Sequence, residues 1–249
     1  ARDKDGHFYF PDEPRGQLFK IDKDSGVKTL VDGDTGKANG IAFGPDGRLY
    51  GCCSGEKTIN AWDPNTWEKT AVTEGTLSND IAILDNGTIF YTDPRSKLVW
   101  TLAAKTFERE TAANLAFKPN GIALSLDKKT LLVAEFDSGT VHGFPIGEDS
   151  KLTGTSHPAY QLAVPSDGKG QLDGMMVLPD GRLLSGTSLG TQIVPPVFAP
   201  SGVQQLLIVP SPEGRPRCNY ARISPAQKWL YTAYRGDLLL RRIAEALVK

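Results

Sequence analysis

The chain has 249 residues, of which 39% are hydrophobic, and this is enough to bury a full hydrophobic core. Its formal net charge of −1, with acidic and basic residues interspersed, excludes the strongly basic surface that nucleic acids and anionic membranes attract. No stretch reaches the ~18 apolar residues of a membrane span, and none reads as an interdomain linker, so we predict a single domain over residues 1–249.

The cysteines and the first residues leave the cellular compartment open. The three cysteines, with Cys52 and Cys53 adjacent, are too few for a disulfide framework and lack the spacing of a metal or redox motif. We expect them to be small buried hydrophobic residues. The first residues do not read as a signal peptide, although one can be removed during maturation. A soluble protein that is cytoplasmic, secreted or periplasmic, and a monomer or a small homo-oligomer, fits the sequence.

Short apolar stretches separated by Gly- and Pro-bearing turns recur along the chain and predict β-strands. In chain order, the first expected strands are residues 7–10, 17–22 and 28–31, and the next repeat has 41–43, 48–52, 58–62 and 70–73. The polar residues that open successive repeats, Asn39, Asn79 and Asn120, lie 40 and 41 residues apart, which is the period of a propeller blade. Since helical periodicity is nearly absent, the pattern predicts an all-β propeller with four strands per blade.

An amide or carboxylate side chain stands at a fixed place in each repeat, seven residues before the Asp or Asn of a hairpin turn. We call these residues the anchors, and a propeller is expected to bring them together at its axis, just before the innermost strands. Amide oxygens with one carboxylate suit a hard cation such as calcium. For any single copy the alternative is that Asn-Gly and Asp-Gly are ordinary turn formers. The anchor and turn pairs are Asn39 and Asp46, Asn79 and Asn86, Asn120 and Asp127, and Asp173 and Asp180, and a weaker copy begins at Asn219.

Five phrases around these residues form a distinctive set: Asn39-Gly40-Ile41-Ala42, Ser78-Asn79-Asp80-Ile81, Tyr91-Thr92-Asp93-Pro94, Pro119-Asn120-Gly121-Ile122-Ala123 and Leu172-Asp173-Gly174-Met175. Together they resemble the gluconolactonase / senescence marker protein (regucalcin) family. The resemblance implies a six-bladed β-propeller with four-stranded blades, acting as a metal-dependent sugar lactone lactonase. It also implies a divalent ion, with Ca²⁺ expected and Zn²⁺, Mg²⁺ or Mn²⁺ as alternatives. The implied ligands are Asn120, Asp173 and a Glu of the first repeat, with Asn79 as a further ligand or a substrate contact.

Lactone hydrolysis agrees with the chemistry of these residues. A divalent ion polarises an ester carbonyl or lowers the pKa of a bound water, and Asp173 is the expected metal ligand and general base. The alternative for Asp173 is a carboxylate that only caps a turn. The candidate substrate contacts are Asn79, Asn39, Asp93 and Glu135, of which Asp93 and Glu135 have a second interpretation as polar residues that end a strand. The expected partner is a small lactone, with no nucleic acid and no membrane.

Other functions stay open on the sequence. The same metal can act on another ester, including a phosphotriester, and propellers also serve as non-catalytic ligand- or protein-binding modules. Gly186-Thr187-Ser188-Leu189-Gly190 matches the nucleophile elbow of serine hydrolases. That motif requires a helix after the serine, and the Pro-containing stretch that follows does not predict one.

The first repeat lacks its anchor. The seven-residue spacing, applied to the Asp5-Gly6 turn, places the anchor ahead of Ala1, where the resemblance puts the metal-binding Glu. After Asn219 only three strands are expected, at residues 221–223, 229–234 and 238–243. We therefore expect an N-terminal strand to be missing, and residues 1–249 alone to bind metal weakly until an extension supplies the Glu. The alternative is that Asp12 or Glu13 replaces that ligand.

Overall fold

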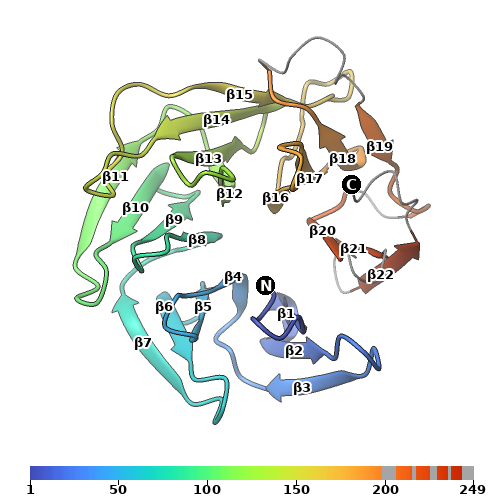
Figure 1. Ribbon diagram of the computed structural model, residues 1–249. Helices are drawn as coiled ribbons and strands as arrows, with labels where there is room; N and C mark the ends of the chain where they lie inside the picture. The colour runs from blue at the N-terminus through green and yellow to red at the C-terminus, as the bar shows by residue number, and fades with distance from the viewer. Residues whose placement is uncertain (198–205, 215–216, 225–228, 235–236, 243–249) are drawn as a thin grey trace. The chain divides into compact units, whose positions relative to one another are not determined.

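The computed structural model describes residues 1–197, 206–214, 217–224, 229–234 and 237–242 (Figure 1). Over these ranges the chain consists of antiparallel strands and one turn of 3-10 helix, η1 (Glu13–Arg15), which confirms the all-β prediction. The same ranges hold no helix with the length and apolar character needed to cross a membrane. Two compact units, Ala1–Ala116 and Phe117–Lys249, divide the chain. The single domain over residues 1–249 stays a prediction.

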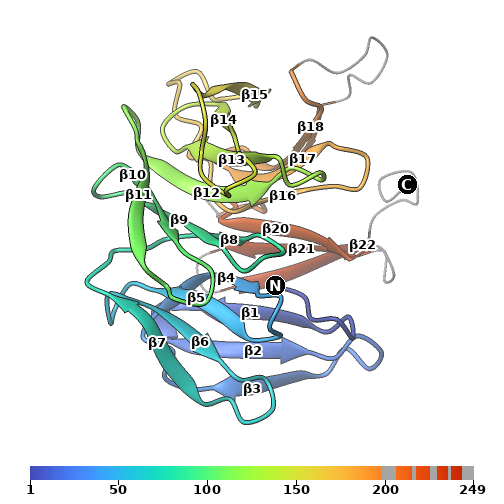
Figure 2. The same cartoon turned by 60° about the vertical axis from the view of Figure 1, so that its left-hand side comes forward.

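The first unit contains three antiparallel sheets whose strands follow one another in chain order. Figure 2 shows the strands of its first sheet, β1 to β3, side by side. The first strands of its other two sheets, β4 and β8, are neighbours. The strands are β1 (Phe8–Asp12), β2 (Gln17–Ile21) and β3 (Lys28–Asp32) in the first sheet, β4 (Ala38–Phe43), β5 (Leu49–Cys53), β6 (Thr58–Trp62) and β7 (Lys69–Glu74) in the second, and β8 (Ile81–Ile83), β9 (Ile89–Asp93), β10 (Leu98–Leu102) and β11 (Arg109–Asn114) in the third.

The second unit repeats this arrangement with three more sheets. Their first strands β12, β16 and β20 lie next to one another in that order. The strands are β12 (Pro119–Leu124), β13 (Thr130–Glu135), β14 (Thr140–Pro145) and β15 (His157–Gln161), then β16 (Met175–Val177), β17 (Leu183–Thr187), β18 (Gly190–Val194) and β19 (Leu207–Val209), and finally β20 (Tyr220–Ser224), β21 (Trp229–Tyr234) and β22 (Asp237–Arg242).

The expectation of four strands in every one of six blades is wrong. In the described residues four sheets have four strands, whereas the first and the last sheet have three. In the first sheet, residues that are too few for a strand still pair with β1. Arg2 forms an antiparallel bridge with Phe8, and Ala1 exchanges backbone hydrogen bonds with Tyr9. In the last sheet, the expected strand 238–243 corresponds to β22, and its final residue lies outside the described ranges.

One hairpin turn recurs between the first two strands of the sheets. In the β4–β5 turn, Gly44 N–H donates to Arg48 O at 2.9 Å and Gly47 N–H donates to Gly44 O at 3.0 Å. Gly47 has a φ of 82°, a conformation that favours glycine, and Asp46 Oδ1 accepts the Arg48 N–H. Local turn chemistry therefore fixes the distance from each anchor to its turn. The same pair of backbone bonds closes the turns at Gly87 and Gly181, and a turn one residue longer closes at Lys128. The turn at Gly6, which leads into β1, has the same two bonds.

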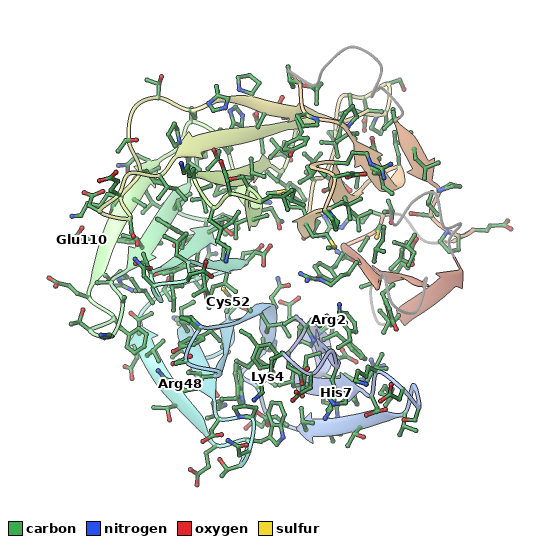
Figure 3. All side chains as sticks on the ribbon, in the orientation of Figure 1. Arg2, Lys4, His7, Arg48, Cys52 and Glu110 are labelled. Atoms are coloured by element: carbon green, nitrogen blue, oxygen red, sulfur yellow. The ribbon has the colours of Figure 1, made fainter. Side chains whose placement is uncertain are left out.

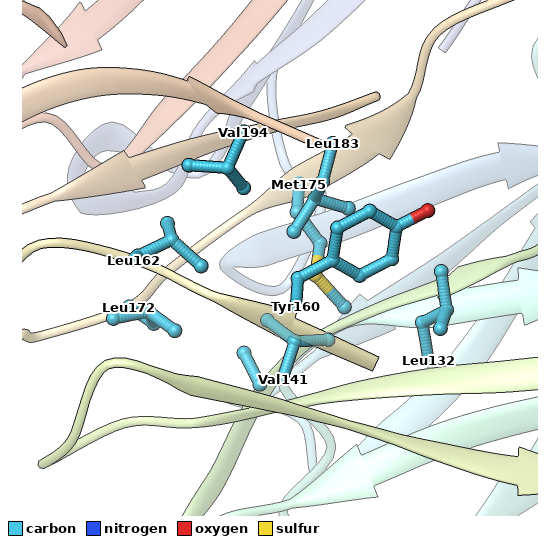
Figure 4. Close-up of a cluster of buried hydrophobic side chains, with 9 residues drawn as sticks. Leu132, Val141, Tyr160, Leu162, Leu172, Met175, Leu183 and Val194 are labelled. Carbon is cyan, nitrogen blue, oxygen red and sulfur yellow. The ribbon is translucent and has the colours of Figure 1, made fainter. Parts of the chain in front are cut away.

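The cores lie between neighbouring sheets of the same unit. In the second unit, strands of its first two sheets bury a cluster of side chains (Figure 4). Leu172 and Met175 belong to this cluster and flank Asp173 in the sequence. Their burial therefore holds that anchor at the start of β16. The cluster contains Leu132, Ala134, Val141, Tyr160, Leu162, Leu172, Met175, Leu183 and Val194.

The core of the first unit contains a buried tryptophan and two buried thiols. Trp62 is fully buried, and its Nε1–H donates to Asp32 Oδ2 at 2.7 Å. Cys52 (labelled in Figure 3) and Cys53 lie on β5 with no exposed surface, and both are free. Burial raises the pKa of Cys53 to about 12, with the Glu56 carboxylate adding to the shift. The cysteines are buried small residues, as predicted.

Candidate functional site

The anchors lie at the beginning of the first strand in five sheets. Asn219 directly precedes β20, and Asn79 and Asp173 lie two residues before β8 and β16, whereas Asn39 and Asn120 lie inside β4 and β12. In β4 and β12 the pairing register shifts at the anchor, between Ala38 and Ile41 and between Pro119 and Ile122. Such bulges turn a side chain away from the regular ladder. The two strands therefore begin earlier than expected, because a bulge lets them continue past the anchor.

A glycine after the anchor allows two neighbouring anchors to approach closely. Gly40 N–H donates to Asn79 O at 2.9 Å in the first unit, and Gly174 N–H donates to Asn219 O at 2.9 Å in the second. A Cβ atom on Gly121 would lie 2.1 Å from the Asp173 carbonyl oxygen, which no side chain can tolerate. The Asn-Gly and Asp-Gly pairs are thus required for contact between sheets. Asn39 is brought beside Asn79, and Asp173 beside Asn120 and Asn219.

The second unit contains three of the anchors, Asn120, Asp173 and Asn219, which we call the row. Asn219 Nδ2 donates to Asp173 Oδ2 at 3.0 Å, and Arg217 Nη2 lies 3.5 Å from the same oxygen. Asn120 is buried, with 7% of its surface exposed, and the Asp173 side chain is 14% exposed. Asn219 Oδ1 is buried and, within the part of the chain that the structure describes, accepts no hydrogen bond. The row therefore offers an oxygen to which no described residue donates a hydrogen bond.

The first unit places Asn39 and Asn79 side by side, both half-buried. Asn79 N–H donates to Thr92 O at 2.9 Å, which ties this anchor to β9. The backbone of Asp80 is tied to Thr92 as well, and its Oδ1 accepts the Ile81 N–H at 2.9 Å. These bonds fix where β8 begins. The convergence of all five anchors on one axis stays a prediction.

Asp93 and Glu135 both have partners in the protein. Asp93 is buried, and its Oδ1 accepts the N–H groups of Arg95 at 3.1 Å and Ser96 at 3.0 Å, so it caps the turn after β9. Glu135, the last residue of β13, lies 3.1 Å from His142 Nε2. These contacts agree with polar residues that end a strand. Their additional role as substrate contacts stays a prediction.

Ser188 lies in the two-residue turn between β17 and β18, not before a helix. Its Oγ donates to Lys169 O at 2.9 Å. The nucleophile elbow requires a strand followed by a helix, so the geometry does not support a serine hydrolase. A thiolate nucleophile is equally disfavoured, because burial raises the pKa of Cys218 to about 11.

Zinc-type ligands do not gather in the described residues, where no three His, Cys, Asp or Glu side chains form a group that could hold a metal. The metal ligands that the row can supply are amide oxygens and one carboxylate, which is the set expected for a hard cation. Asp12, the alternative ligand near the N-terminus, accepts Arg15 Nη1 at 2.7 Å and caps η1.

Three residues near Asp173 are missing from the sequence-based set of candidates: Lys118, Phe136 and Arg217. Arg217 Cζ lies 5.3 Å and Lys118 Nζ lies 4.1 Å from the centre of the Phe136 ring. The sequence does contain a signal for the two cations, because each stands two residues before an anchor, Asn120 or Asn219. No comparable signal marks Phe136.

Known proteins are similar to this chain in sequence and in fold. A family model described as the SMP-30/Gluconolactonase/LRE-like region matches residues 1–218. A gluconolactonase of Zymomonas mobilis is 27% identical over 256 residues, which cover 87% of this chain and 70% of that protein. The structure of a gluconolactonase from Xanthomonas campestris superposes with a TM-score of 0.77 at 21% identity, covering 94% of this chain and 81% of the other. A calcium-binding protein, regucalcin, from Agrobacterium tumefaciens gives a TM-score of 0.68 at 15% identity, covering 90% and 76%. The chain therefore has an all-β propeller fold.

Proposed function

Because the chain belongs to the SMP-30/Gluconolactonase/LRE-like family, we propose that it is a metal-dependent lactonase that opens a sugar lactone or a similar small cyclic ester. The observation that carries this proposal is the row of Asn120, Asp173 and Asn219 in the second unit. Relatives named gluconolactonase support the reaction class. The hydrogen bond from Asn219 to Asp173 supports the position of the catalytic carboxylate.

The residues of the row fit a divalent cation. Hard cations take amide and carboxylate oxygens, and Asn120 and Asp173 supply one of each. The Asn219 amide directs its nitrogen to Asp173, and its buried Oδ1 accepts no hydrogen bond from the described residues. A buried oxygen without a donor is costly unless another electropositive group faces it. Calcium is the first candidate, since a relative is described as calcium-binding, and Zn²⁺, Mg²⁺ or Mn²⁺ are the alternatives.

When bound, such an ion supplies polarisation of the lactone carbonyl and a lower pKa for a coordinated water. The water oxygen attacks the carbonyl carbon while Asp173 accepts a proton from that water. The ring C–O bond then breaks, and the leaving alkoxide takes back the proton held by Asp173, which gives the hydroxy acid and restores the carboxylate. Asn219 Nδ2–H and the Arg217 guanidinium, both near Asp173 Oδ2, hold the carboxylate in one orientation.

Asn79 and Asn39 belong to the first unit, and we propose that they act on the substrate. Asn79 is assigned as a substrate contact that also ligates the ion, and Asn39 as a contact to a sugar hydroxyl. Asp93 and Glu135 are assigned weaker roles, because their carboxylates already serve a turn and His142. Asn79→Ala is expected to lower turnover more than it lowers metal affinity.

The test is a panel of aldonolactones, assayed by proton release with and without a chelator, together with calcium titration by calorimetry. Asp173→Asn, which keeps the shape and removes the charge, is expected to lower kcat/KM by at least about a hundredfold and to weaken calcium binding. Ser188→Ala is the matched control. It removes a hydroxyl that only donates to the Lys169 carbonyl oxygen, and it is expected to retain activity. Full activity of Asp173→Asn, or unchanged activity in chelator, would refute the proposal. Hydrolysis only of phosphotriesters or other esters, or calcium binding without any hydrolysis, would favour the alternative functions.

A further inference from the structure

Two cationic side chains share one aromatic ring beside the row of anchors. Lys118 Nζ lies 4.1 Å and Arg217 Cζ lies 5.3 Å from the centre of the Phe136 ring. Both distances are within the range of cation–π attraction. All three residues are half-buried, so they remain in contact with solvent.

The backbone places this ring next to Asp173. Phe136 N–H donates to Lys118 O at 2.9 Å, and Leu172 N–H donates to Phe136 O at 3.0 Å. Leu172 is fully buried and directly precedes Asp173. Phe136 is therefore connected on one side to the segment that leads into Asn120 and on the other side to the segment that carries Asp173.

The charges around the ring do not balance. Arg217 Nη2 lies 3.5 Å from Asp173 Oδ2, and that oxygen also accepts Asn219 Nδ2–H. Lys118 has no ion-pair partner among the residues that the structure describes. Glu135, the residue before Phe136, lies against His142 at 3.1 Å. Among the described residues Arg217 thus has one carboxylate partner and Lys118 has none, and two cations held near one ring repel each other unless an anion joins them.

We propose that Lys118 and Arg217 form an anion subsite, and that the preferred substrate is a lactone that also carries an ionised group, a carboxylate or a phosphate. This rests on the proposed lactonase function and names its substrate class. The guanidinium is planar and pairs with either anion through two parallel hydrogen bonds, whereas the ammonium acts as a point charge. The Phe136 ring, over which both cations lie, attracts them without neutralising their charge. The ionised group binds between the two cations, so the ester end of the molecule faces Asp173.

Two matched pairs of lactones test this subsite. D-Glucono-1,4-lactone and D-glucaro-1,4-lactone have the same ring and differ in one carboxylate. D-Glucono-1,5-lactone and its 6-phosphate differ in one phosphate. The measured quantity is the ratio of kcat/KM for the anionic lactone to kcat/KM for its neutral partner. Proton release follows each reaction in the full chain with saturating calcium.

Wild-type protein is expected to prefer the anionic member of at least one pair, and the pair that shows the preference identifies the anion. Arg217→Gln and Lys118→Gln are each expected to lower this ratio by about tenfold, the effect of losing one charge-assisted contact. Lys129→Gln removes one exposed charge from the turn that joins the same two strands, β12 and β13, and is expected to leave the ratio unchanged. Arg217→Lys should restore part of the preference.

The outcomes separate this subsite from the lactonase activity itself. If wild-type protein opens the neutral and anionic lactones equally well, or if both Gln variants keep the wild-type ratio, the subsite is refuted and the lactonase proposal stands. If Arg217→Gln loses activity equally on both members of a pair while Lys118→Gln keeps the ratio, Arg217 only positions Asp173, and the subsite is again refuted. If no lactone is opened by wild-type protein, the proposed function itself fails.

Discussion

Replacing Gly121 by alanine tests the close approach of the anchors. The added Cβ atom would lie 2.1 Å from the Asp173 carbonyl oxygen and 3.1 Å from the carbonyl carbon. A carbon and an oxygen that are not bonded need about 3.2 Å or more, so the backbone at Asp173 has to move by roughly 1 Å. Rotation of a side chain cannot relieve the contact, because the atoms that clash belong to the main chain.

The displacement is expected to affect activity more than stability. Overpacking of this kind costs about 1–3 kcal/mol, and a chain of this size loses about 2–4 °C of melting temperature per kcal/mol. A shift of about 1 Å in a catalytic group can lower the rate about a hundredfold. We therefore expect Gly121→Ala to remain folded, with a lowered melting temperature and a much reduced kcat on aldonolactones.

Thermal unfolding followed by circular dichroism and steady-state lactone hydrolysis measure the two effects. Gly33→Ala is the matched control, because a Cβ atom there meets no other atom within 4 Å and its φ is not in the left-handed region. Wild-type activity and melting temperature in Gly121→Ala would refute the close packing of Asn120 against Asp173. Equal losses in both alanine variants would refute it as well.

Two further predictions concern the core of the first unit. Trp62→Phe leaves Asp32 without the Nε1–H donor and is expected to lower the free energy of unfolding, measured by chemical denaturation, by about 1–3 kcal/mol. The control is Trp100→Phe, because the Trp100 Nε1–H has no acceptor among the described residues, and this variant should lose less stability. Equal losses in the two variants would contradict the reasoning. Burial raises the pKa of Cys53 from an ordinary value near 9 to about 12, so the stability supplied by its neutral thiol is present below pH 9 and is lost as pH rises towards 12. Cys53→Ala should therefore lose less stability than wild type between pH 8 and pH 10.5 in denaturant titrations, and parallel losses would contradict this.

The sequence determined the strands and turns of this protein, because their causes are local. Residues 58–62 were expected as a strand and form β6 (Thr58–Trp62), and the Asp46-Gly47 turn adopts the left-handed conformation that its glycine favours. The spacing from anchor to turn needs only one strand and one hairpin, so it repeats wherever the same residues recur. The all-β class and the positions of the anchors follow from this pattern.

Only the tertiary structure decided which anchors touch and what surrounds them. Asn219 and Asp173 are far apart in the sequence, and their hydrogen bond exists because β16 and β20 are neighbours. The need for glycine at Gly121 likewise comes from the backbone of another sheet. A periodic pattern describes each segment separately and contains no information on contacts between segments. For this reason Phe136, which matches no motif, was found beside Arg217 only after the sheets were packed together.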